Sequence, residues 1–197
     1  MEPSRFEKQM SFLLEIDKLK SVVRQNYLSD GSRRENDVEH SWHLAMMVLL
    51  LAEHFEGLDI LKTVKMALIH DIVEIYAGDT FAYDEKGYED KDEREQQAAK
   101  RIYSLLPGGQ QKEYAALWRE FEEMETQEAL CAAIMDRLQP LMLNFASEGK
   151  MWQNRGITAE KVWKRNGIVL DKAPQCIKDY VQSLIRQGSE KGYFAKE

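Results

Sequence analysis

Hydrophobic residues recur every three or four positions along nearly the whole chain, the spacing that gathers them on one face of an α-helix. Alternating apolar and polar runs bounded by turn residues, the pattern of a half-buried β-strand, are not found in the sequence. We therefore predict an all-α fold. About seven to eight helices are expected, at about residues 4–23, 36–54, 59–77, 90–106, 110–125, 127–147, 158–166 and 174–187.

Polar and small residues mark where these helices begin and end. Asn36 or Asp37 can cap the start of the second helix, and Asp59 can cap the third, which is expected to end near Gly78. An irregular segment then runs to about residue 90 and carries three aromatic residues among acidic ones. Two interpretations of this segment stay open, a mobile flap beside a binding site or a solvated loop.

Length and composition suit one domain. A chain of 197 residues that is 44% hydrophobic can bury one core, so residues 1–197 are predicted to form a single domain with the helices of residues 158–187 packed on it. The longest apolar run, Leu44 to Ala52, is less than half of the roughly 20 residues that span a bilayer. The N-terminus lacks a secretion-signal pattern, and Cys131 and Cys176 lie in apolar helical patterns that suit reduced thiols. We predict a cytoplasmic protein without membrane contact.

The net charge narrows the range of partners. It is −7 at pH 7, with a pI near 5.3, whereas proteins that bind nucleic acids usually carry a basic surplus. We therefore predict no nucleic-acid partner. A small anionic substrate would need a metal ion or a local group of arginines.

The stretch ALIHDIVEIYAGDT, residues 67–80, places an imidazole and two carboxylates in an otherwise apolar helical run. Successive side chains of an α-helix are about 100° apart, so His70, Asp71 and Glu74 point to one side. The other faces of this helix are apolar, which directs the polar side toward the interior or a cleft. Burying two carboxylates together is costly unless a cation or hydrogen-bond partners offset it.

Two further ligand-type residues stand alone on apolar helix faces, His40 and Asp136. Each has an ordinary explanation when taken singly, because a buried His often bonds a backbone carbonyl and Asp136 can pair with Arg137. As a set from three helices, His40, His70, Asp71 and Asp136 offer two imidazoles and two carboxylates. Such a mixed site suits a divalent ion of Mn, Co, Fe, Ni, Zn or Mg and leaves positions for water and substrate. The absence of a thiolate from the set argues against a closed structural zinc site.

The order of these motifs along the chain resembles a known family. EHS at 39–41, HDIVE at 70–74, GD at 78–79 and the helical Asp136 together resemble the HD-domain phosphohydrolases. Within them the chain is most similar to the short, all-helical branch of 5′-deoxynucleotidase-like proteins. The resemblance covers roughly residues 10–145.

The resemblance implies a role for each matching residue. The metal ligands that it implies are His40, His70, Asp71 and Asp136. Glu74 matches the catalytic carboxylate, and Asp79 matches a position that contacts the nucleoside sugar or the attacking water. Arg24 approximately matches an arginine of the substrate pocket. Gln25 stands where the family often has a Trp that selects the deoxyribose, and this departure puts a preference for 2′-deoxy substrates in doubt.

Other residues near these motifs have open assignments. Arg33 and Arg34 could neutralise a substrate phosphate or be ordinary surface charges. The chain has four histidines, too few for the additional ligands of two-metal relatives, which favours one metal ion. His43 is a candidate for supporting a ligand from behind, and His54 is expected near a helix end or exposed.

The sequence therefore predicts a hydrolase, a metal-dependent phosphomonoesterase acting on nucleoside 5′-monophosphates or similar small phosphates. One alternative is a hydrolase that removes several phosphates from nucleoside triphosphates. Another is a helical nucleotide sensor that keeps its metal for stability and catalyses nothing. Apolar residues expected to be exposed near Trp152 and Trp163, together with the resemblance, predict a homodimer.

Overall fold

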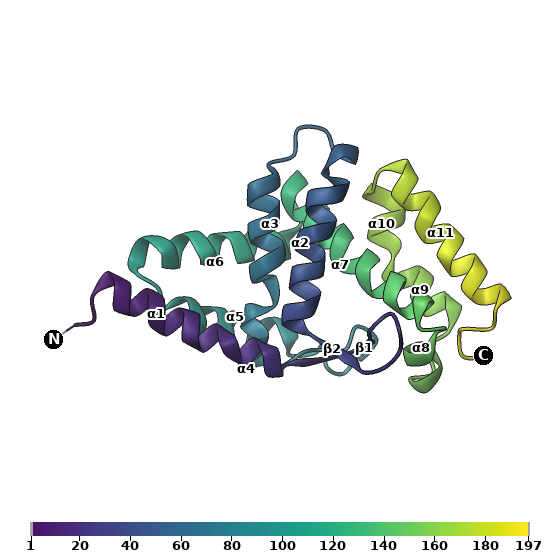
Figure 1. Ribbon diagram of the computed structural model, residues 1–197, viewed down its shortest axis with the longest axis horizontal. Coiled ribbons are helices and arrows are strands. Elements are labelled where there is room, and N and C mark those ends of the chain that lie inside the picture. The colour runs from purple at the N-terminus through teal and green to yellow at the C-terminus, as the bar shows by residue number, and fades with distance from the viewer. Residues whose placement is uncertain (1, 197) are drawn as a thin grey trace.

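Three helices form the centre of the molecule. The computed structural model describes residues 2–196, and within it α2 (Asp37–Leu51), α3 (Ile60–Ile69) and α7 (Gln127–Ala146) all pack against one another (Figure 1). Asn36 caps α2 by accepting a hydrogen bond from the backbone of Glu39, and the Glu39 side chain returns one to Asn36. Asp59 caps α3 in the same position that the sequence indicates.

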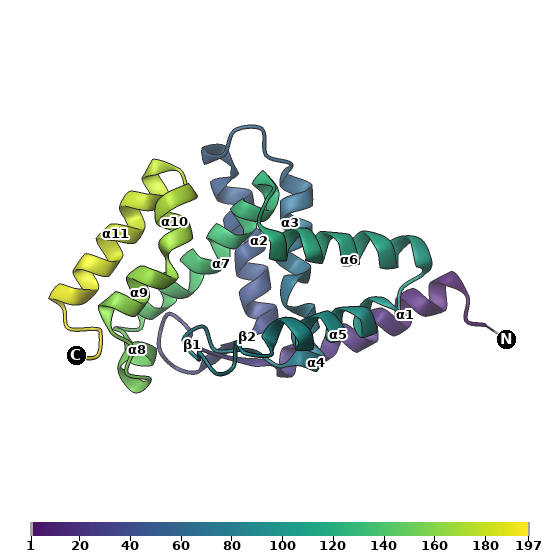
Figure 2. The same cartoon turned by 180° about the vertical axis from the view of Figure 1, so that it is seen from behind.

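The remaining helices lie at two ends of this centre, as both views show (Figures 1 and 2). One end holds α1 (Arg5–Ile16), α5 (Lys91–Tyr103) and α6 (Gly108–Glu123). The elements of the other end are α8 (Lys150–Asn154), α9 (Ala159–Arg165), α10 (Gly167–Lys172) and α11 (Gln175–Glu190). Buried apolar side chains form one cluster at each end, and α7 contributes to both. The long helix α7 therefore joins the two ends.

The prediction of a first helix reaching residue 23 is wrong. α1 ends at Ile16, a 3-10 helix covers Asp17–Ser21, and β1 (Val23–Tyr27) pairs antiparallel with β2 (Arg34–Asn36). Hydrophobic alternation could not reveal this hairpin, because the buried positions of its strands are the polar residues Asn26 and Glu35. The all-α class is nevertheless confirmed, since this small sheet is the only one in residues 2–196.

The third predicted helix is interrupted where its polar residues lie. α3 stops at Ile69, a 3-10 helix follows over His70–Val73, and α4 covers Glu74–Ala77. The His70 ring bonds the carbonyl of Ala67, which competes with the regular helical pattern of backbone bonds. The relative directions of these side chains therefore differ from those of a continuous α-helix.

The helix count predicted from the sequence is slightly low. The short helices α8 and α10 are additions, and α11 runs to Glu190, three residues beyond the predicted end. A five- or six-residue helix offers too few turns for a hydrophobic period to be recognised. None of the helices in the described part of the chain is long and apolar enough to cross a bilayer.

Candidate functional site

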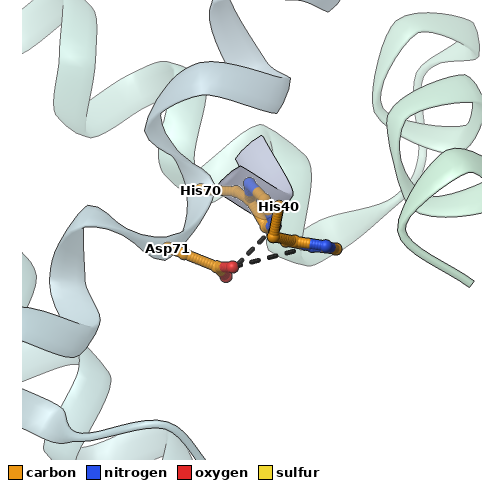
Figure 3. Close-up of side chains that lie close together, drawn as sticks. All are labelled: His40, His70 and Asp71. Atoms are coloured by element: carbon orange, nitrogen blue, oxygen red, sulfur yellow. Dashed lines mark ion pairs between the residues drawn. The ribbon is translucent and has the colours of Figure 1, made fainter. Parts of the chain in front are cut away.

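The four predicted ligands come together where α2, the 3-10 helix and α7 meet. His40 Nε2 lies 3.1 Å from Asp136 Oδ1, and His70 Nε2 lies 3.1 Å from Asp71 Oδ1. The two pairs face each other, since His40 Nε2 is 3.8 Å from Asp71 Oδ2 and His70 Nε2 is 3.9 Å from Asp136 Oδ1. Figure 3 shows His40 and His70 directed toward Asp71.

This arrangement fits a divalent ion. Nitrogen and oxygen ligands about 2.0–2.2 Å from one ion can be at most about 4.4 Å apart, which exceeds these four of the six pairwise distances. His40, His70 and Asp71 have ligand atoms that all lie within 4.8 Å of one another. His70 Nδ1 donates to the carbonyl oxygen of Ala67 at 3.0 Å, so Nε2 is the ring nitrogen that faces the carboxylates and can become a ligand when a metal ion displaces its proton. That Nε2 is buried and has no hydrogen-bond partner among the described residues. Burial lowers the pKa of His70, but the Asp71 and Asp136 carboxylates outweigh it and raise the pKa to about 10, so the site favours positive charge.

His40 is oriented by a buried network behind it. Its Nδ1–H donates to Gln139 Oε1 at 3.0 Å, and Gln139 Nε2 donates to Glu35 Oε2 at 2.8 Å. This leaves the lone pair of His40 on Nε2, the atom that faces the other ligands. Burial and the nearby Arg24 lower the pKa of His40, which keeps the ring neutral. His43 supports the network from behind, with Nδ1 3.3 Å from Gln139 Nε2.

Arg24 lies among carboxylates at the edge of the ligand group. Its guanidinium donates to Asp71 Oδ2 at 2.8 Å and to Asp37 Oδ1 at 3.3 Å, and Nε is 3.6 Å from Glu35 Oε1. Burial opposes ionisation of Asp37, and together with the charge of Asp71 it raises the pKa of Asp37 to about 7 despite Arg24. The sequence placed Arg24 near the site but gave Asp37 only a capping role.

Glu74 is buried beside this group, and its Oε2 has no hydrogen-bond partner among residues 2–196. Burial, followed by the negative charges of Asp71 and Asp37, raises the pKa of Glu74 well above its ordinary value. Burial also raises the pKa of Asp79. Both carboxyl groups can therefore hold a proton close to the ligand group.

One cavity of about 270 Å³ contains this chemistry. Its lining includes Arg24, Asp71, Glu74, Asp79 and Asp136. The irregular segment supplies Phe81, Tyr83 and Tyr88 to the wall, and the first two also pack against the core. The solvated-loop interpretation of this segment is therefore wrong for Phe81 and Tyr83, whereas Tyr88 is exposed as that interpretation expects.

Comparison with known proteins identifies the family. A family model described as HD domain matches residues 16–177, most of the chain. The chain belongs to the HD domain family. The 5'-deoxynucleotidase HDDC2 of Bos taurus is 31% identical over 147 residues, which cover 74% of this chain and 70% of that protein. Its namesake from Dictyostelium discoideum is 30% identical over 146 residues, or 71% of this chain and 77% of that one.

A solved structure agrees with this family assignment. The crystal structure of a predicted metal-dependent phosphohydrolase from Magnetospirillum magnetotacticum MS-1 is 48% identical, covers 100% of both chains and superposes with a TM-score of 0.93. The family resemblance of the sequence is thus confirmed. This HD domain is a metal-dependent phosphohydrolase, and its His and Asp side chains form a group able to bind a divalent ion.

Two arginines suggested for phosphate binding lie elsewhere in this HD domain. Arg33 pairs with Glu39, one of its bonds measuring 2.9 Å, and the Arg34 guanidinium lies 6.0 Å from the centre of the Tyr27 ring. Neither arginine lines the cavity. Their geometry fits the alternative of ordinary surface charges.

The wall segment between α4 and α5 is held by Arg94. Its guanidinium donates to the carbonyl oxygens of Ala77 at 2.6 Å and Gly87 at 3.0 Å, and to Thr80 Oγ1 at 3.1 Å. Three bonds from one side chain fix both ends of the segment, which places its aromatic residues against the cavity.

Replacing Arg94 with Ala is expected to raise KM several-fold and to leave kcat and metal content nearly unchanged. Each lost bond is worth about 0.5–1.5 kcal/mol, enough to loosen the wall without disturbing the ligands. Steady-state kinetics and metal analysis of Arg94→Ala, with the exposed Arg186→Ala as control, measure this. An unchanged KM would show that the wall does not depend on Arg94.

Proposed function

We propose that this HD domain is a phosphomonoesterase that hydrolyses nucleoside 5′-monophosphates to nucleoside and phosphate. The observation that carries this proposal is that three of the four predicted ligands, His70, Asp71 and Asp136, line one cavity together with the buried Glu74 and the cation Arg24. The fourth, His40, lies behind them with Nε2 3.1 Å from Asp136 Oδ1. The relatives named 5'-deoxynucleotidase support a nucleotide as the substrate.

In this proposal His40, His70, Asp71 and Asp136 hold one divalent ion of Mn, Co, Fe, Ni, Zn or Mg. When held by these residues, the ion would supply Lewis-acid chemistry, withdrawing charge from a phosphoryl oxygen and lowering the pKa of water. Arg24 donates to Asp71 Oδ2 and so leaves Oδ1, the oxygen nearer His70, available as a ligand. The same guanidinium supplies positive charge for the substrate phosphate.

Glu74 carries the proton. Its raised pKa lets the carboxylate take a proton from the attacking water and, as the carboxyl group, give that proton to the leaving 5′-oxygen in the same turnover. Asp79 lines the same cavity at the start of the wall segment, and in this proposal it contacts the sugar hydroxyls or the attacking water. Gln25 also lines the cavity, where its side chain accepts a hydrogen bond from Arg155.

A nucleotide screen tests the function. The purified protein is incubated with nucleoside and deoxynucleoside mono- and triphosphates and each metal ion in turn, and the products are separated by chromatography. We expect inorganic phosphate and nucleoside from monophosphates. Stepwise loss of phosphate from triphosphates would favour the alternative hydrolase, and binding without hydrolysis of any nucleotide would favour the sensor.

The homodimer and the cytoplasmic location stay predictions, but one basis for the dimer is wrong. Trp152 is 0% exposed, and Trp163 is partly buried. Large exposed apolar side chains occur instead on α1, including Phe6 and Leu14. Light scattering coupled to size-exclusion chromatography tests the dimer directly.

A further inference from the structure

Three asparagines line the cavity that contains the ligand group, and we call them the amide cluster: Asn26, Asn144 and Asn166. Their exposed fractions are only 8%, 2% and 2%. They come from β1, from the end of α7 and from the junction of α9 and α10. Neutral amides neither bind the metal nor supply charge for a phosphate, so the function proposed above gives them no role.

Two buried oxygens of the amide cluster lack hydrogen bonds. Asn144 Oδ1 and Asn166 Oδ1 have no partner among the described residues, although both residues lie at the cavity wall. Leaving a buried acceptor unpaired costs about 1–3 kcal/mol, so such atoms in folded proteins usually serve a ligand or water.

The hydrogen bonds around these asparagines show that the side-chain oxygen, and not the nitrogen, is the atom without a partner. Gln139 Nε2 donates to Glu35 Oε2, and the neighbouring Asn26 amide is one of the groups that lower the pKa of that carboxyl against the effect of burial. Asn144 Nδ2 donates to Asn26 Oδ1 at 3.1 Å. Asn166 Nδ2 donates to the carbonyl oxygen of Val162 at 2.9 Å. Because both nitrogens are engaged, each residue presents an acceptor oxygen.

Two elements lead from the ligand group to the amide cluster. Asn144 follows Asp136 by eight residues on α7, about 12 Å along a helix with a rise of 1.5 Å per residue. Asn26 follows Arg24 by two residues on β1, and both residues line the cavity. A ligand with its phosphate at Arg24 and Asp136 therefore extends toward the amide cluster, as the base of a mononucleotide would.

We propose that the amide cluster is the nucleobase subsite of this enzyme and that it favours bases with an exocyclic amino group. The inference rests on the proposed nucleotide substrate. Two acceptor oxygens require hydrogen-bond donors, and cytosine offers the two hydrogens of its amino group. Uracil has the same ring but a carbonyl oxygen at that position, which cannot donate. Phe81 and Tyr83, on the wall of the same cavity, provide aromatic faces for the base.

The matched pairs CMP and UMP, and dCMP and dUMP, test this subsite in the wild-type enzyme. We expect kcat/KM to favour the cytosine member of each pair by about ten-fold, the value of roughly one hydrogen bond to a buried acceptor. Equal kcat/KM values, or a preference for uracil, would overturn the proposal and show that the oxygens are served by water only.

Single substitutions test whether Asn144 and Asn166 cause the preference for cytosine over uracil. Asn144→Ala and Asn166→Ala are each expected to reduce the ratio of CMP to UMP hydrolysis toward one while metal content stays unchanged. Asn154→Ala, an exposed residue of α8, should keep the wild-type ratio. Thermal unfolding checks that each variant is folded, and if one is not, the other carries the test. A ratio unaffected in both folded variants would contradict the assignment.

Binding separates this inference from the function on which it rests. Calorimetric titration of metal-loaded Glu74→Gln protein with CMP and UMP measures base preference without turnover. Tighter binding of CMP supports the amide cluster even if the wild type hydrolyses neither nucleotide, a result that would reject only the phosphomonoesterase. Hydrolysis of both nucleotides with equal affinities would reject only the base preference.

Discussion

Asp71→Ala is expected to abolish metal binding and phosphate release together. The substitution removes a carboxylate that faces both His40 and His70, and it also removes the closest partner of the buried Arg24. Loss of a residue that only supports a metal ligand costs about 10–100-fold in affinity or activity, so loss of a ligand should cost more. Elemental analysis after dialysis and a phosphate-release assay measure the two effects on the same sample.

The exposed Asp179→Ala on α11 serves as the matched control and should keep its metal and its turnover. A circular dichroism spectrum of Asp71→Ala shows whether the helices are retained. Normal turnover by a folded Asp71→Ala protein would reject the ligand assignment.

Glu74→Gln is expected to lose activity while keeping its metal. The variant has nearly the same shape but cannot give or take a proton, and a positioned general acid or base contributes typically 10²–10⁴-fold. We therefore expect kcat to fall by about that factor with metal content unchanged. A variant that retains full kcat would show that another group transfers the proton.

The same variant should be more stable than the wild type when metal is removed. Folding raises the pKa of Glu74, so between the ordinary and the raised value the folded protein binds more protons than the unfolded chain. The free energy of unfolding of the wild type therefore falls as pH rises through that range. Gln does not titrate. Thermal unfolding in a chelator should thus give Glu74→Gln a Tm at or above that of the wild type, with the gap widening as pH increases.

The site residues that interrupt apolar helical patterns could be predicted from the sequence. His40 and Asp136 interrupt apolar helix faces, and the dyad His70 and Asp71 interrupts another, so each stood out against a regular period. His40 and Asp136 are 96 residues apart in the sequence, yet their contact could be predicted because the order of the motifs matches that of a known family.

The supporting network was not visible for a physical reason. Gln139 and Glu35 are buried, yet in the sequence a Gln or Glu looks the same whether it faces water or a hydrogen-bond partner. Gln139 lies three residues after Asp136 on α7, and this spacing places both on one helix face. The spacing was the one feature of the sequence that could have revealed Gln139 as part of the site. Glu35 and Asn26 depend on a hairpin whose buried positions are polar, so no hydrophobic pattern marked them.

Because α7 joins the two ends of the molecule, the predicted metal ligands and the residues of the far cavity wall lie in different parts of the sequence. All four predicted ligand positions fall between residues 40 and 136, whereas the part of the cavity wall at Asn144, Trp152 and Asn166 is encoded after them. Mutations in the last third of the chain can therefore reshape the far wall of the cavity while the ligand atoms stay in place. A lineage could in this way exchange one substrate for another without passing through an inactive ancestor.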